Sequence, residues 1–145
     1  MEFCLNLVYK SWKDVKDEII LPQKSSPRLC ELIGILAWDG SIASDVEKTK
    51  DYRIQIYANA FDESEYLVHT KNLVKSLFNL DMKSFLSKSD NTIYLLKRSK
   101  AVFYFLKNIG YEKVDSFIKV PSWIWEDTLF AASLVRGLFD TDGCL

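Results

Sequence analysis

Two nonapeptides decide the fold that this sequence predicts: LIGILAWDG at residues 32–40 and VRGLFDTDG at residues 135–143. They share the pattern apolar-x-Gly-apolar-apolar-x-x-Asp-Gly, at an offset of 103 positions. Each is typical of a helix end with an apolar face, a glycine that lets another helix approach closely, and an acid in the last turn. If the two helices pack through Gly34 and Gly137, then Asp39 and Asp142 meet at the same end.

The two acids point to a metal site. A carboxylate at a helix C-terminus is unfavourable by itself, because the helix dipole is already negative there. A divalent cation explains the placement, and Mg²⁺ commonly takes one or two protein carboxylates together with substrate phosphates. One Asp-Gly pair after a helix is an ordinary turn signal. Two matching nonapeptides favour the interpretation that Asp39 and Asp142 bind Mg²⁺ or another divalent cation.

The rest of the chain alternates helical and extended patterns. Ser26 can cap a helix at residues 28–38, Pro27 suits its first position, and Gly40 is expected to end it in the left-handed conformation. Period-two alternation predicts a half-buried strand at residues 52–58, with its inner side chains at Ile54, Ile56 and Ala58. The remaining expected elements are a strand at 41–46, a helix at 63–78, strands at 82–87 and 92–97, and helices at 99–108 and 128–141.

This order predicts an α+β fold of the type αββαββα, in which helices cover one face of a four-stranded antiparallel sheet and the other face is open. We expect three segments: an N-terminal extension at 1–24, a first domain at 25–126, and a second motif helix at 127–145 without a following sheet. The charged run at residues 13–18 is typical of a solvated helix or turn. His69 has no acidic or cysteine partner at ligand spacing, which indicates a surface histidine.

The paired nonapeptides and the pattern between them resemble the LAGLIDADG homing endonucleases over residues 25–145. The second motif matches the family more closely than the first, which has Ala37 and Trp38 where the family name reads Asp-Ala. The resemblance implies a curved sheet that straddles the DNA major groove, and hydrolysis of DNA phosphodiesters with divalent metal ions. It assigns the metal-binding acids to Asp39 and Asp142.

The resemblance also gives the open strand face a role in DNA binding. It implies that Arg53, Gln55 and Tyr57 point at the duplex, with Lys83 and Lys97 as further contacts to phosphates or bases. Lys97, where a strand meets a helix, is similar to the position at which the family places a basic residue near the scissile phosphate, so it is a catalytic candidate. For each residue taken alone, a solvated strand face is the simpler interpretation.

Composition limits these expectations. The chain has 145 residues and a formal net charge of −1, from 19 Lys plus Arg against 20 Asp plus Glu. DNA-binding proteins usually carry a basic excess, so a DNA interface here requires charges that are segregated by face. The three cysteines show no zinc or disulfide pattern, and neither a membrane span nor a signal peptide is visible. We expect an intracellular, cytoplasmic and reducing location.

The second motif is followed by two residues, so no second sheet is expected. Its helix would leave an apolar face uncovered, which predicts self-association or a complementary chain that supplies the second sheet. A truncation, an inactive remnant and one partner of a split enzyme all remain open. A non-cleaving DNA- or RNA-binding module of the same fold, such as a regulator or a maturase, and an unrelated α+β protein are the alternatives in function.

Overall fold

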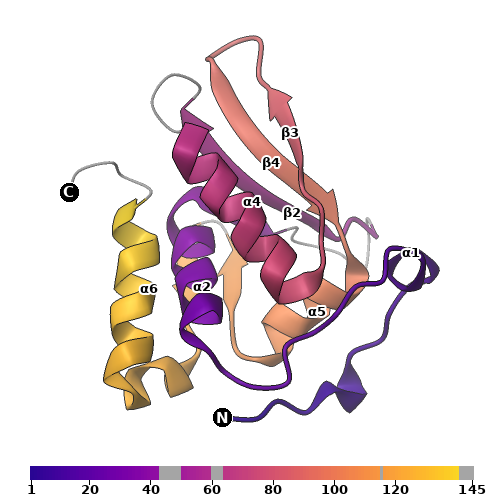
Figure 1. Ribbon diagram of the computed structural model, residues 1–145, viewed down its shortest axis with the longest axis vertical. Helices are drawn as coiled ribbons and strands as arrows, with labels where there is room; N and C mark the ends of the chain where they lie inside the picture. The colour runs from indigo at the N-terminus through magenta and orange to yellow at the C-terminus, as the bar shows by residue number, and fades with distance from the viewer. Residues whose placement is uncertain (43–49, 60–63, 115, 141–145) are drawn as a thin grey trace.

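Helices and strands alternate along the chain and build an α+β fold (Figure 1). The computed structural model describes residues 1–42, 50–59, 64–114 and 116–140. None of the helices in these ranges has the length and apolar character needed to cross a membrane. The elements are η1 (Leu5–Leu7), α1 (Trp12–Lys16), α2 (Pro27–Asp39), β1 (Gly40–Ile42), β2 (Arg53–Asn59), α4 (Ser64–Phe78), β3 (Lys83–Leu86), β4 (Thr92–Arg98), α5 (Lys100–Asn108), β5 (Glu112–Val114), β6 (Phe117–Lys119), η2 (Ser122–Glu126) and α6 (Thr128–Asp140).

Four strands form one antiparallel sheet in the order β1-β2-β4-β3. Residues that pair directly across an antiparallel ladder have side chains on the same face. Ile56 pairs with Leu95, and both side chains are buried. Ile54 and Ala58 are buried on the same face, as the period-two pattern predicts. The predicted antiparallel four-stranded sheet is confirmed.

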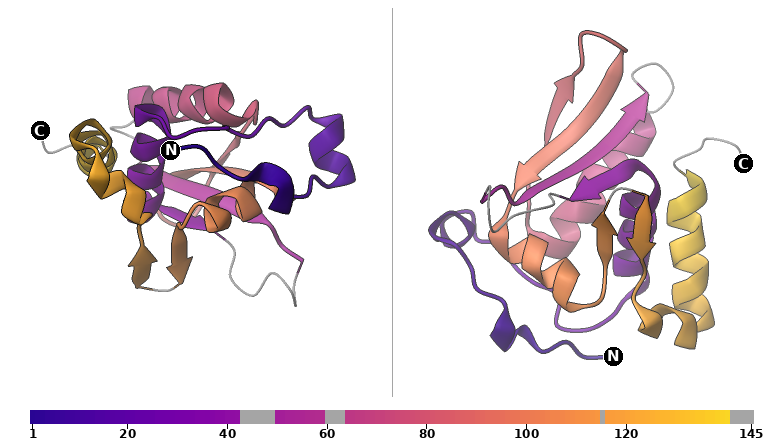
Figure 2. Two further views of the ribbon diagram at one scale, coloured as in Figure 1. Left: turned by 90° about the horizontal axis from the view of Figure 1, so that it is seen from below. Right: turned by 180° about the vertical axis from the view of Figure 1, so that it is seen from behind.

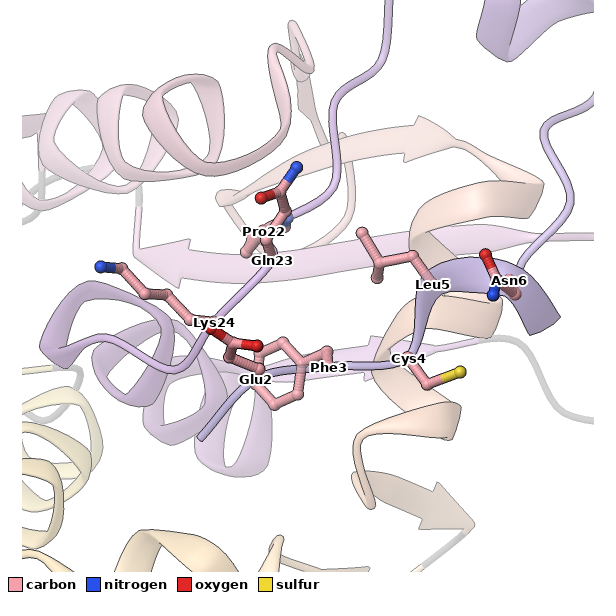
Figure 3. Close-up of a pocket in the computed structure, with 8 residues that line it drawn as sticks. All are labelled: Glu2, Phe3, Cys4, Leu5, Asn6, Pro22, Gln23 and Lys24. Atoms are coloured by element: carbon pink, nitrogen blue, oxygen red, sulfur yellow. The ribbon is translucent and has the colours of Figure 1, made fainter.

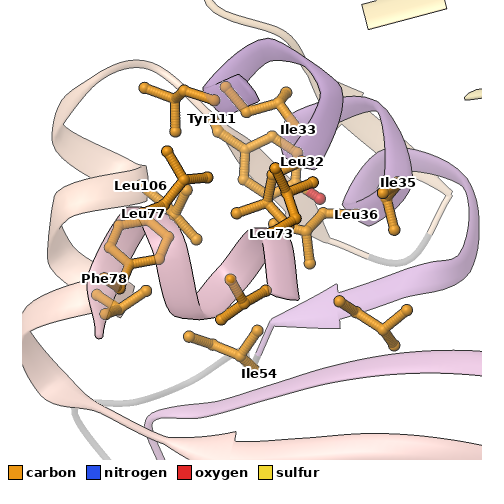
Figure 4. Packing of buried hydrophobic residues seen from close by; sticks show 14 of the residues in the cluster. Leu32, Ile33, Ile35, Leu36, Ile54, Leu73, Leu77, Phe78, Leu106 and Tyr111 are labelled. Atoms are coloured by element: carbon orange, nitrogen blue, oxygen red, sulfur yellow. The ribbon is translucent and has the colours of Figure 1, made fainter. Parts of the chain in front are cut away.

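The hydrophobic core lies between this inner face and the helices. Side chains of α2 and α4 pack together above β2, with Leu106 of α5 and Tyr111 beside them (Figure 4). Seen from behind, β2, β3 and β4 lie in front of α4, and no described helix covers them (Figure 2). The sheet therefore has one packed face and one open face.

The predicted start of α2 is confirmed. Ser26 accepts a hydrogen bond from the backbone N–H of Leu29, and Pro27 is the first helical residue. The predicted conformation of Gly40 is wrong, because Gly40 has φ −103° and ψ 165°, which is extended, and it begins β1. Glycine is needed there for space, since a Cβ would lie 2.6 Å from Cα of Leu36.

The N-terminal segment is part of the folded unit. Ile19 is buried in the core, and the ring of Phe3 packs edge-on against Phe105 at 5.6 Å. The charged run is not fully solvated as expected, because Asp14 is 2% exposed. The Asp14 carboxylate accepts hydrogen bonds from the Ser99 hydroxyl at 2.6 Å and the Ala101 N–H at 3.0 Å. Asp14 thus fastens the segment at residues 1–24 to the start of α5.

Candidate nucleic-acid interface and metal site

Helices α2 and α6 lie side by side and run in the same direction (Figure 1). They touch backbone to backbone at Gly34 and Gly137. A Cβ on Gly34 would lie 2.2 Å from the carbonyl oxygen of Leu134, and one on Gly137 would lie 2.2 Å from that of Glu31. These two contacts are equivalent under the offset that relates the two nonapeptides, so the interface is nearly symmetric. Only residues without a side chain permit this approach.

The parallel packing places the C-terminal ends of both helices at one end of the molecule. Asp39 is the last residue of α2 and is partly buried. Asp142, its counterpart in the second nonapeptide, lies outside the described residues. The structure therefore describes one of the two expected metal-binding acids.

Lys113, which the sequence did not predict to be part of the site, lies at the C-terminal end of α2. The Lys113 ammonium, from β5, donates to the carbonyl oxygens of Gly40 at 2.5 Å and Leu36 at 3.4 Å. Burial lowers the pKa of Lys113, and the nearby negative charge of Asp39 partly offsets this shift. A cation at a helix C-terminus stabilises the last carbonyl groups and the helix dipole. The β5–β6 hairpin had no clear strand pattern in the sequence, so its lysine had no assigned position.

The donor atoms at this end are compatible with a hard divalent cation. Asp39 supplies a carboxylate, and Mg²⁺ usually completes its shell with water and substrate phosphate oxygens. No cluster of three or more His, Cys, Asp or Glu side chains that could hold a metal occurs within the described ranges. A site here therefore needs substrate oxygens and ligands from residues that the structure does not describe.

The open face of the sheet carries four of the five residues that were predicted to contact DNA. Arg53, Gln55 and Tyr57 alternate with the buried side chains of β2, so they lie on the open face. Lys83 lies on the same face, because Lys83 and Gln55 both pair with Leu96. The side chain of Arg53 is 41% exposed. The face therefore presents both charge and hydrogen-bonding groups to solvent.

Three further residues on this face were missed in the sequence: Arg98, Tyr94 and Phe85. Arg98 pairs with Arg53, while Tyr94 pairs with both Tyr57 and Phe85. The segment at residues 93–96 is apolar throughout, so its pattern did not distinguish an inner face from an outer one. The pairing with β2, whose alternation is clear, is the signal that would have identified them.

No protein-family model and no curated protein matched the chain. Its fold does match solved structures. Mesophilic variants of the homing endonuclease I-DmoI align over 79% of this chain and 60% of theirs, with 18% identity and a TM-score of 0.55. A structure of I-DmoI in complex with DNA and Mn aligns with the same identity and TM-score over 61% of its chain, and one with DNA and Ca over 56%. The chain has the LAGLIDADG homing endonuclease fold.

The homing endonuclease fold was predicted from the paired nonapeptides, and that prediction is confirmed. The chain spans about 60% of the length of the I-DmoI structures.

Within the homing endonuclease fold, Lys97 lies on the opposite face of the sheet from Arg53, Gln55, Tyr57 and Lys83. Lys97 pairs with buried Ile54, so its side chain lies on the face of the sheet that the helices cover. The side chain is 17% exposed. The ammonium lies 3.6 Å from the carboxylate of Asp17 in the N-terminal segment. Side chains alternate along β4, and the neighbouring Arg98 takes the outward position. Lys97 therefore does not share the open face with the other four residues, and its part in DNA contact and catalysis stays a prediction.

His69 is a surface residue of α4, as predicted, with its side chain 53% exposed. Its Nε2 lies 2.9 Å from the carboxylate of Glu31 on α2. The two residues are 38 positions apart, so spacing along the chain gave no sign of the pair. This contact links α4 to α2.

A large open cavity, of about 700 Å³, does not coincide with the candidate site (Figure 3). Its lining comes from the N-terminal segment alone: Glu2, Phe3, Cys4, Leu5, Asn6, Pro22, Gln23 and Lys24. The features that fit nucleic-acid chemistry lie instead on the open sheet face and at the ends of α2 and α6.

Proposed function

We propose that this chain is a DNA endonuclease of the homing-endonuclease type, or one half of such an enzyme, that binds double-stranded DNA and cleaves it with Mg²⁺. The observation that carries the proposal is the parallel, glycine-packed pair α2 and α6, which ends at Asp39 beside an open antiparallel sheet face. An acid at a helix C-terminus is costly unless a cation neutralises it. The same arrangement occurs twice in the sequence, at Asp39 and at Asp142.

In the proposed reaction a bound divalent cation would lower the pKa of the attacking water and stabilise the leaving oxygen. Asp39 and Asp142 would hold the cation through their carboxylates. Lys113 would keep the end of α2 in place by binding the carbonyl groups of Leu36 and Gly40, so that the Asp39 carboxylate is held at a fixed position. No side-chain nucleophile is required.

The open sheet face would bind the duplex. Arg53 and Arg98 lie side by side at one end of it, and Lys83 lies on β3. A net charge of −1 is compatible with DNA binding where basic side chains gather on one face, because local positive potential attracts phosphates. Asp51 pairs with both Arg53 and Arg98, at 3.6 and 3.2 Å, so phosphates would have to compete with this half-buried carboxylate.

A nicking assay with supercoiled DNA tests cleavage. We expect metal-dependent nicking by the wild type, and its loss in Asp39→Asn and Asp142→Asn, while duplex binding in EDTA persists in all three. Asp81→Asn is the matched control, because Asp81 is 80% exposed and pairs with Lys75 on α4. Nicking by Asp39→Asn at the wild-type rate would refute the assignment. Duplex binding without any metal-dependent nicking would favour a non-cleaving binding module.

We also propose that the chain associates with a second copy of itself or with a complementary chain. The support is α6, which packs on α2 on one side and leaves Leu129, Val135 and Phe139 at least 40% exposed. Apolar side chains repeated along one helix are a usual partner surface. Light scattering should show a dimer that dissociates on Phe139→Glu. A monomer at high concentration, both alone and with DNA, would contradict self-association.

A further inference from the structure

Three aromatic side chains form one row across the open face of the sheet. Tyr57 on β2 pairs with Tyr94 on β4, which pairs with Phe85 on β3. The ring centroids are 6.2 Å apart for Tyr57 and Tyr94, and 5.4 Å apart for Tyr94 and Phe85. Tyr57 is 40% exposed and Phe85 is 41% exposed. Such a row on a face that no described helix covers is suited to an apolar group of a partner.

The arrangement of the rings shows how that group is contacted. The planes of Phe85 and Tyr94 are within 18° of each other, so the two rings stack and cover one face each. Single-stranded nucleic acid needs free ring faces on which its bases can stack. Stacking covers the facing sides of the two rings, so a partner meets the pair at its remaining exposed surface, which suits van der Waals contact with a small apolar group. The C5-methyl of thymine is the apolar group that base pairs present in the major groove.

The polar neighbours of the row fit the same base. The Tyr57 hydroxyl donates to the side-chain carbonyl of Gln55 at 3.1 Å, which leaves the Gln55 amide nitrogen to donate to a partner. Gln55 and Lys83 both pair with Leu96, in the row beside the aromatic one. Thymine presents its O4 acceptor next to its methyl group. A donor beside an apolar edge is complementary to that pair of groups.

We propose that Phe85, Tyr94 and Tyr57 read thymine through its C5-methyl group, with Gln55 donating to O4, so that the chain prefers A·T pairs beneath this row. The inference rests on the proposed DNA binding and names the base that this part of the face selects. Arg53 and Arg98, toward the opposite end of the face, are placed to contact the phosphate backbone.

The test compares thymine with deoxyuridine, which lacks only the methyl group. Duplexes that bind the wild-type chain are selected from a random-sequence library, and each enriched thymine is replaced by deoxyuridine. Affinity is measured by fluorescence anisotropy at low salt. We expect adjacent thymines to be enriched, and each contacted methyl to strengthen binding about fourfold, the effect of burying one methylene-sized group.

Variants locate the effect on the row. Phe85→Ala should bind thymine and deoxyuridine duplexes equally at the position it contacts, whereas Tyr57→Phe keeps the ring and should retain the methyl preference. Trp12→Ala is the matched control, because Trp12 is 77% exposed on α1 and is not on the sheet. If Phe85→Ala fails to fold, the comparison of thymine with deoxyuridine duplexes in the wild-type chain still tests whether the methyl group is read.

Each other outcome overturns the inference in a distinguishable way. Equal affinity for thymine and deoxyuridine at every enriched position overturns methyl reading but leaves duplex binding intact. Tighter binding to single strands than to duplexes would mean that the rings stack on bases. No binding to any duplex overturns the proposed function together with this inference.

Discussion

Replacing Gly34 by alanine should destabilise the protein, although helix propensity alone predicts the opposite. In a helix interior, alanine is more favourable than glycine by about 1 kcal/mol. The added Cβ would, however, lie 2.2 Å from the Leu134 carbonyl oxygen, 3.0 Å from the Leu138 nitrogen and 3.1 Å from Cα of Gly137. All three are backbone atoms, which no side-chain rotation can move. The sign of the change therefore reports whether α2 and α6 touch as described.

The magnitude follows from the shortfall in space. Ordinary contact begins at 3.4 Å, so α6 must move away from α2 by about 1 Å to admit the methyl group. Overpacking of a well-packed interface typically costs about 1–3 kcal/mol. Because rigid backbone is on both sides, we expect an overpacking cost at the upper end of this range. After subtraction of the gain in helix propensity, this gives a net loss of about 2 kcal/mol for Gly34→Ala, and a similar loss for Gly137→Ala. The double variant should lose much less than the sum, since one separation admits both methyl groups.

Urea unfolding followed by far-ultraviolet circular dichroism measures these changes. Ala132→Gly, at an exposed position of α6, is the matched control and should show only the propensity cost of about 1 kcal/mol. A Gly34→Ala variant that is more stable than the wild type would refute the reasoning, because it would mean that the two helices do not meet at this glycine.

Three other predictions have defined outcomes. Burial acts to raise the pKa of Asp14, but hydrogen bonds from Ser99, Ser11 and Ala101 outweigh it and hold the pKa below its ordinary value of 3.8. The stabilisation that the ionised Asp14 carboxylate provides is therefore present above about pH 4 and lost as the pH falls through its folded-state pKa. Asp14→Asn should lower the free energy of unfolding in urea by about 3 kcal/mol at pH 7. The difference in unfolding free energy between this variant and the wild type should shrink at pH 3. Tyr111→Phe should stabilise the fold by about 1 kcal/mol and so raise the melting temperature, since the Tyr111 hydroxyl is buried without a hydrogen-bond partner in the described structure. A lower melting temperature would show that this hydroxyl is hydrogen-bonded. Burial, with a contribution from Asp127, raises the pKa of Cys30 to about 12, so in a chain with the other two cysteines replaced by serine, a thiol reagent at pH 8 should label Cys30 only after denaturant is added.

The sequence predicted most of the fold because its strongest signals are local. Ser26 and Pro27 mark the start of α2 by the chemistry of a helix N-terminus, and the alternation at residues 53–58 identifies the inner face of β2. The β5–β6 hairpin was not predicted, because three-residue strands are too short to show a period. Short strands of this kind are set by their tertiary neighbours rather than by their own pattern.

The residues of the candidate site also fall into two groups, those that local sequence patterns predict and those that depend on tertiary structure. Gly34, Gly137 and Asp39 were identifiable because a repeated motif records a symmetric helix contact in the sequence itself. Lys113 was not, because its position depends on a hairpin that brings β5 to the end of α2, 73 residues away from Gly40 along the chain. The face of Lys97 could not be predicted for the converse reason: a basic residue near the end of a strand suggests an exposed charge, yet the face on which it lies depends on register with β2. Residues that act through helix ends can thus be predicted from spacing, whereas those that act from strands require the pairing of the sheet.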